Sequence, residues 1–218
     1  MENLKPPREI NVGWHMINVT EGEPCPVEPM HMRRAISVKP RILEGRGKLG
    51  RVVMRSATER DAGEIIKVFN TVAKEGLTVI TKFPYGIDWE RRYLREFAKK
   101  KKGYFFVLQK GEEMIGHGVV AASNLNYTRH TGMVEFILKR NYRYKGLEKQ
   151  ILDTCMAWIR PFRVTKIKTD FVRRNRYALK VFRRYGFKWE GTLKKEAIVN
   201  NKFMDIVIMR HELKRRRG

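Results

Sequence analysis

From residue 51 onward, the sequence alternates between short apolar runs and longer segments with helical periodicity. Residues 51–55 form an apolar run, after which Ile65, Phe69 and Val72 recur at the three- and four-residue spacing of a helix. Strands are expected at 51–55, 104–108, 114–121, 132–138, 166–172, 187–190 and 203–211, and helices near Asp61, Asp88, Gly146 and Asn175. This alternation predicts one α/β domain with a single core.

The first 50 residues differ from the rest in composition. They contain six of the eight prolines, and Gly45, Gly47 and Gly50 close the segment. Such a segment is expected to extend from the domain, because it has no core of its own. We therefore predict an N-terminal extension over 1–50, a domain over 51–213 and a basic tail over 214–218.

Neither a membrane nor a metal is predicted as a partner. No stretch approaches the roughly 18 consecutive apolar residues that a membrane span requires, and the N-terminus lacks a signal-peptide pattern. A cytoplasmic protein is therefore expected. The two cysteines, Cys25 and Cys155, lie far apart in the sequence, which disfavours a disulfide framework and a zinc site.

The net charge of +24 predicts an anionic partner. Residues 1–50 contain eight basic and six acidic residues, so the excess of the 47 basic over the 23 acidic residues lies almost entirely in the domain and tail. Self-repulsion of this size disfavours the compact state unless an anion is bound, and phosphate backbones attract such surfaces. A heat-adapted surface is the alternative, but it normally pairs Lys and Arg with similar numbers of Glu. We expect RNA or a ribonucleoprotein.

One candidate binding segment is the turn between the strand at 132–138 and the helix that follows it. A turn of this kind directs backbone N–H groups and the positive end of the helix dipole at one point, which suits a pyrophosphate. Arg143 and Lys145 add positive charge to the turn around Gly146. The alternative is a simple strand-to-helix turn in which the glycine allows tight packing.

A second segment, later in the chain, changes the interpretation of the first. Asn175 stands at an expected helix start, Ala178 follows three residues later, and Gly186-Phe187 leads into a strand. Taken together, the two segments resemble the GNAT family of acetyl-CoA-dependent N-acetyltransferases. Its R/Q-x-x-G-x-G/A turn matches at Arg143 and Gly146, and its N-x-x-A-(x)7-G-F segment matches in the later helix.

The resemblance implies a fold, a cofactor and a reaction. The implied GNAT fold is a mixed, mostly antiparallel sheet of about six or seven strands flanked by about four helices. Two parallel strands, here 133–138 and 166–172, are expected to separate and hold the pantetheine arm of acetyl-CoA, and the acceptor amine attacks the thioester directly, without a metal. The implied cofactor-binding residues are Leu138, Arg143, Tyr144, Lys145, Gly146, Leu147, Glu148 and Asn175.

The sequence departs from the family pattern at two positions. Glu148 stands where the family has Gly or Ala; its carboxylate repels a diphosphate if it faces the turn, but can also point outward and leave its N–H available. Phe182 stands at the position of the usual tyrosine acid. Tyr185, three residues later, is the candidate proton donor, with a core or rim aromatic as the alternative.

The candidate base is Glu135, the only carboxylate in the strand at 132–138. It can activate an amine through a water molecule, although burial against a basic partner explains a glutamate there equally well.

Basic residues and aromatic residues alternate around the Asn175 helix. Such a surface can hold phosphates while its aromatic rings stack on unpaired bases. The expected RNA-binding residues are Arg173, Arg174, Arg176, Lys180, Arg183, Arg184, Lys188, Arg215, Arg216 and Arg217.

Two hypotheses follow from the sequence. The first is an acetyl-CoA-dependent N-acetyltransferase that modifies a protein or nucleoside amine on an RNA-containing assembly. The second is a GNAT domain that has lost its chemistry and serves as a structural RNA-binding or ribosome-associated protein.

Overall fold

The computed structural model describes residues 39–78, 85–99, 102–199 and 201–213. Most of the expected extension and the whole basic tail, with Arg215, Arg216 and Arg217, lie outside these residues. The strands are β1 (Arg41–Gly45), β2 (Gly50–Ser56), β3 (Gly103–Lys110), β4 (Glu113–Ala122), β5 (Thr131–Leu138), β6 (Lys166–Val172), β7 (Lys188–Val199) and β8 (Lys202–Glu212). The helices are α1 (Ala62–Ala73), α2 (Ile87–Lys99), α3 (Leu147–Ile159) and α4 (Arg176–Tyr185).

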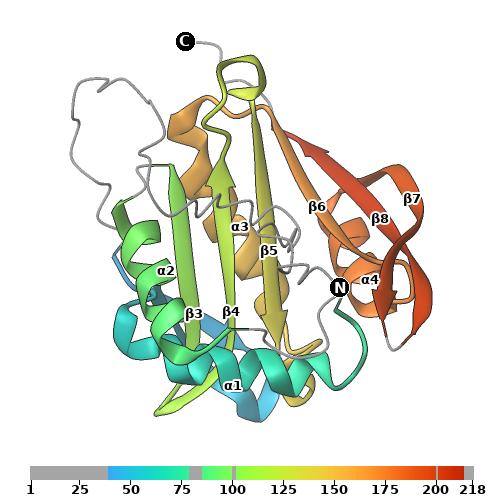
Figure 1. Cartoon of the computed structure of the whole chain (residues 1–218). Helices are drawn as coiled ribbons and strands as arrows, with labels where there is room; N and C mark the ends of the chain where they lie inside the picture. Colours follow the sequence, from blue (N-terminus) through green and yellow to red (C-terminus); the bar gives the residue numbers. More distant parts are fainter. Residues whose placement is uncertain (1–38, 79–84, 100–101, 200, 214–218) are drawn as a thin grey trace, which may run out of the picture. The chain divides into compact units, whose positions relative to one another are not determined.

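The described strands form one sheet in the order β1-β2-β3-β4-β5-β6-β8-β7, with helices on both faces (Figure 1). α1 and α2 cover one face, where Ile65 and Leu94 pack with Val107 of β3. α3 and α4 cover the other face, where Ile151 and Phe182 belong to the main core with Phe106. The mixed, mostly antiparallel sheet and the four helices confirm the predicted α/β fold, with one strand more than expected.

The additional strand is β1, which lies inside the segment expected to be an extension. It forms a hairpin with β2, in which Leu43 pairs with Val52 and both side chains are buried. The connection turns through Gly47 and Gly50, whose φ angles of 61° and 64° favour glycine. The glycines and Pro40 that indicated an extension therefore belong to a tight hairpin and to the start of its first strand.

The parallel pair β5–β6 is joined over only part of its length. Register pairs connect Thr131–Met133 with Lys166–Lys168, and the described residues show no pairing between the two strands beyond them. β6 instead stays paired with β8 along its whole length. The two strands therefore separate toward their carboxyl ends, as expected from the resemblance (Figure 1).

The hairpin of β7 and β8 is longer than the sequence predicts. A short strand was expected at 187–190, whereas β7 continues to Val199. It is an edge strand with mostly exposed residues, and two register shifts interrupt its pairing with β8. Alternating hydrophobicity, the signal on which strand prediction depends, is weak in such a strand.

Helix α4 begins at a side-chain cap. Asn175 accepts a hydrogen bond from the N–H of Ala178 at 3.0 Å and donates from Nδ2 to the carbonyl oxygen of Leu77 at 3.1 Å. The cap fixes the first turn of the helix, and the amide nitrogen ties it to the segment that follows α1.

We expect Asn175→Ala to lower the free energy of unfolding by about 1 kcal/mol, the usual cost of losing a cap. Asn175→Ser keeps a capping oxygen and loses the bond to Leu77 as Asn175→Ala does, so its loss should be less than half as large. Urea denaturation measures both changes. Equal losses in the two variants would contradict capping as the main role of Asn175.

Candidate functional site

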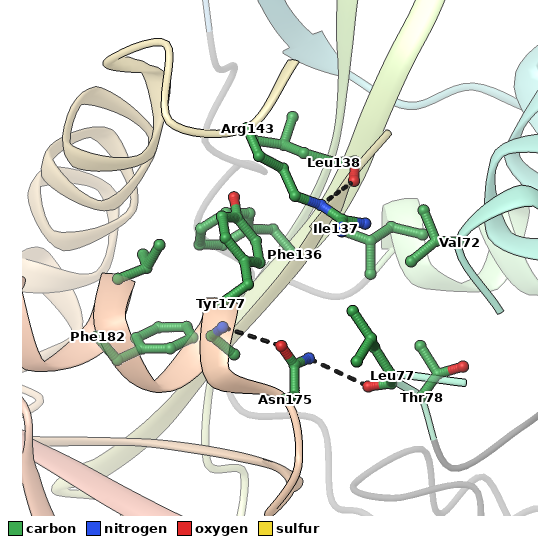
Figure 2. A pocket seen from close by; sticks show the side chains of 12 residues that line it. Val72, Leu77, Thr78, Phe136, Ile137, Leu138, Arg143, Asn175, Tyr177 and Phe182 are labelled. Carbon is green, nitrogen blue, oxygen red and sulfur yellow. Dashed lines mark hydrogen bonds between the residues drawn. The ribbon is translucent and has the colours of Figure 1, made fainter. Parts of the chain in front are cut away.

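A pocket lies where β5 and β6 separate, and it is closed on one side by α4 (Figure 2). About 390 Å³ of space in and at the mouth of this pocket, open solvent included, is not filled by protein atoms. Its walls come from the end of β5, the first turns of α4, the end of α1 and the segment after α1. The lining residues are Val72, Leu77, Thr78, Phe136, Ile137, Leu138, Arg143, Asn175, Tyr177, Ala178, Val181 and Phe182.

Aromatic packing sets the inner wall of the pocket. The ring of Phe182 lies 5.9 Å from that of Phe136, and it stacks against Phe171 at the same distance. Phe187, the residue after the α4 cap glycine, meets Phe182 edge-on at 5.0 Å. The wall is therefore apolar and well packed, and the position where the family usually carries a tyrosine holds a ring without a hydroxyl group.

The segment after α1 is fastened beside the pocket by residues at the start of α4. Arg174 donates from Nε to the carbonyl oxygen of Gly76 at 2.7 Å, next to the bond from Asn175 to Leu77. Because Leu77 and Thr78 line the pocket, these bonds fix one side of its opening.

The side chain of Arg143 is bonded to other groups of the protein. Its guanidinium group forms a two-pronged ion pair with Glu75, with nitrogen–oxygen distances of 2.6 and 2.8 Å. Nε donates to the carbonyl oxygen of Leu138 at 2.9 Å (Figure 2), and the group lies 4.9 Å from the centre of the Tyr177 ring. A phosphate at this arginine would have to compete with a carboxylate already in place.

The turn before α3 retains several free donors. Gly146 precedes the helix with a φ of 86°, and the carbonyl oxygen of Lys145 accepts from the N–H of Arg46 at 2.7 Å. Among the hydrogen bonds of the described residues, none uses the N–H of Lys145, Gly146 or Leu147 as its donor. These groups, at the positive end of the helix, are suited to an anion.

Glu148 faces this turn. Its Oε1 accepts from the N–H of Tyr144 at 2.5 Å and from the hydroxyl group of Tyr177 at 3.2 Å, and the side chain is buried. Of the two orientations that the sequence left open, the structure has the inward one. A carboxylate occupies a donor of the turn, so the turn does not fit a diphosphate while Glu148 lies there.

The predicted cofactor-binding residues therefore divide into four groups. Leu138, Arg143 and Asn175 line the pocket. Tyr144 and Lys145 are exposed beside the turn. Leu147 is buried in the core, so only its backbone can meet a ligand, and Gly146 and Glu148 shape the turn itself.

Glu135 lies in the middle of β5 with its side chain on the opposite face of the sheet from Phe136. Burial, reinforced by the nearby charge of Asp170, raises the pKa of Glu135 to about 8. Tyr93 of α2 lies within electrostatic range of Glu135. A carboxyl group with this pKa can take up a proton at slightly alkaline pH, which suits a general base.

Tyr185 does not line the pocket. Its hydroxyl group donates to Asp153 of α3 at 3.0 Å, and its ring packs edge-on against His211. Burial and the bond to Asp153 raise its pKa. This placement corresponds to the structural alternative for Tyr185 and does not support a role as the proton donor at the pocket.

Two residues that shape the site could not be identified from the sequence. Glu75 lies in the segment after α1, where no motif points to it, and it pairs with Arg143 from 68 positions away. Tyr177 lies inside the later family segment, but at a position where that pattern accepts any residue. Only the three-dimensional contact with Glu148 and Arg143 identifies Tyr177.

Most of the predicted RNA-binding residues in the described chain share one surface on and around α4. Arg173 forms an ion pair with Asp205 at 3.4 Å, and Arg174 donates a hydrogen bond to the carbonyl oxygen of Gly76. Of the predicted RNA-binding residues within the described chain, those that are exposed and have no acidic partner there are Arg176, Lys180, Arg183, Arg184 and Lys188. We call these five residues the α4 cationic surface. It retains its full charge for an external anion.

The described part of the chain shows neither a candidate membrane-spanning helix nor a candidate metal site. None of its helices is both long enough and apolar enough to span a membrane. No three of its His, Cys, Asp and Glu side chains are grouped as metal ligands would be. Cys155 is buried, and burial raises the pKa of its thiol.

Residues 54–208 match the model of the Acetyltransferase (GNAT) domain. The chain is 26% identical over 101 residues to the L-amino acid N-acetyltransferase AaaT of Escherichia coli K12, a match that covers 44% of this chain and 60% of that protein. The chain thus spans less than two thirds of this relative.

Solved structures share the fold. YncA of Salmonella typhimurium, a putative acetyltransferase solved with acetyl-CoA, superposes with a TM-score of 0.66 at 13% identity, covering 77% of this chain and 96% of that one. A ribosomal-protein-alanine N-acetyltransferase from Brucella melitensis gives 0.66 at 18% identity, covering 73% and 99%. The family match over residues 54–208 identifies an acetyltransferase domain. With the β5–β6 pocket and the matched domain together, the chain belongs to the GNAT acetyltransferase family.

Proposed function

We propose that this protein is an acetyl-CoA-dependent N-acetyltransferase that modifies a protein or nucleoside amine on an RNA-containing assembly in the cytoplasm. The observation that carries the proposal is the pocket between the separated strands, which brings together Leu138, Arg143 and Asn175. These residues come from three different elements, and all three were expected to contact the cofactor.

The pocket suits the arm of an acyl thioester better than a charged group. Phe136, Val181 and Phe182 give it apolar walls, which favour an alkyl chain. Beyond Met133, the edge of β5 that faces β6 has no strand partner in the described residues. An amide-containing arm can pair with such an edge through backbone hydrogen bonds.

Glu135 is the proposed proton acceptor for the amine. It lies on β5 beside Phe136, whose side chain lines the pocket from the other face of the strand. With a pKa of about 8, it is largely protonated at neutral pH and becomes an effective base as the pH rises. The other groups that influence this face are Asp170 on β6 and Tyr93 and Glu90 on α2.

Acetyl transfer to a panel of peptide amino termini, lysine side chains and aminated nucleosides can be followed by release of the CoA thiol. We expect kcat/KM to rise with pH through about 8, because the base acts in its deprotonated form. Glu135→Gln should lower kcat by about 10²-fold or more and remove this dependence. Glu112→Gln, in an exposed turn, is the control. Full activity in Glu135→Gln would refute the role of Glu135, and transfer to no amine would refute the enzymatic proposal.

The second candidate function is a structural RNA-binding GNAT domain without catalysis. Three observations favour it: Phe182 lacks an acidic proton, Tyr185 is bonded to Asp153, and Glu148 occupies the turn. The α4 cationic surface supports RNA contact under either hypothesis, because α4 contains no acidic residue to neutralise it. The similarity to a ribosomal-protein acetyltransferase is consistent with a ribosomal partner under both.

Filter binding to single-stranded RNA at several salt concentrations tests the contact. The affinity should fall with added salt, and replacing Arg176, Lys180 and Arg184 together by Ala should reduce the logarithmic slope by about 2. The control replaces Lys67, Arg91 and Lys99, which make the same charge change but are paired with acids in their own helices. Equal losses in the two triple variants would show that only net charge matters, and binding that does not respond to salt would exclude the proposed surface.

A further inference from the structure

We infer that the carboxylate of Glu148 occupies the place in the turn where a diphosphate would bind. The site therefore selects an acyl donor by its pantetheine arm and not by its nucleotide end. The inference deepens the proposed function and rests on it. Glu148 is then a specificity-determining residue at a position where the family pattern has Gly or Ala.

Three features determine the position of the Glu148 carboxylate: the start of α3, the N–H of Tyr144 and the hydroxyl group of Tyr177. Glu148 lies on the first turn of α3, where the helix dipole favours a negative charge. Its Oε1 is the acceptor for the N–H of Tyr144, which belongs to the turn, and for the hydroxyl group of Tyr177, which belongs to α4. The carboxylate therefore bridges the two segments between which a diphosphate would have to enter.

Two groups that could attract a diphosphate are already paired within the protein. The N–H of Tyr144 is already used, and the charge of Arg143 is neutralised by Glu75. A second anion brought close to Glu148 meets a like charge in a partly desolvated site, where repulsion is stronger than in water. The free N–H groups of the turn are then insufficient to favour the diphosphate over water.

The nearby cations are exposed and offset this repulsion only in part. The exposed side chain of Arg46 packs against Gly146, the amino group of Lys180 lies 5.5 Å from the centre of the exposed Tyr144 ring, and Lys145 is exposed. Charges in these positions are screened by salt, whereas Glu148 is buried beside the turn. They can guide a phosphorylated ligand toward the surface, but they leave the interior of the turn anionic.

A ligand series separates the arm from the diphosphate. Pantetheine has the arm and no phosphate, whereas CoA has both. If Glu148 excludes the diphosphate, the wild-type protein should bind CoA no more than about threefold more tightly than pantetheine. Removing the carboxylate should restore a preference for CoA, because the Tyr144 N–H and the helix start become available to an oxygen of the diphosphate.

Isothermal titration of pantetheine and CoA into the full chain tests this prediction. We expect Glu148→Ala to raise the affinity for CoA by about tenfold or more while leaving that for pantetheine within about twofold. Glu148→Gln keeps an acceptor for Tyr144 without the charge, so it should give an intermediate gain. Glu112→Ala, which makes the same change in net charge at an exposed turn, should change neither affinity.

The outcomes distinguish the inference from the proposed function. Tight binding of CoA by the wild type, unchanged or weakened in Glu148→Ala, would refute the inference and leave the function standing. Binding of neither ligand by any variant would refute both. Amide hydrogen exchange gives an independent reading, since the Tyr144 N–H should exchange faster in Glu148→Ala, and unchanged exchange would contradict the assigned contact. If Glu148→Ala does not fold, the gain in CoA affinity must appear in Glu148→Gln.

Discussion

The site depends on the buried ion pair between Arg143 and Glu75. The guanidinium group also donates to the carbonyl oxygen at the end of β5 and lies over the ring of Tyr177, so one side chain connects the segment after α1, the sheet, the turn and α4. Burying an arginine is favourable only if its donors are satisfied, and loss of either partner leaves an uncompensated charge. This network keeps the four elements at the distances that define the pocket.

The network also explains why two motif residues differ in their roles from what the pattern implies. Arg143 was expected to face a phosphate. It instead holds neighbouring segments together, and its charge is neutralised by Glu75. Glu148 then supplies a negative charge where the pattern has a small residue. Both contacts lower the positive charge that the turn offers to an anion, and the apolar pocket lies beside it. The charge available to polyanions lies instead on the outer face of α4.

Much of the fold could be predicted from the sequence, because it depends on local periodicity and on two segments with defined spacing. The strand at Lys166–Val172 was predicted with the observed limits, and the helix that Asn175 caps was predicted at its observed start. Strand β1 was missed because its glycines resemble those of a linker, although they form a hairpin. The orientation of Glu148 and the partner of Arg143 could not be predicted, since each depends on a residue distant in sequence, Tyr177 and Glu75 respectively.

The central claim is that the acyl donor binds in the pocket where β5 and β6 separate. Hydrogen–deuterium exchange of the full chain with and without acetyl-CoA tests it most directly. The account predicts slower exchange in peptides covering 134–138 and 176–182, with little change in the β7–β8 hairpin. Unchanged exchange in both pocket peptides at a saturating concentration of acetyl-CoA would contradict it.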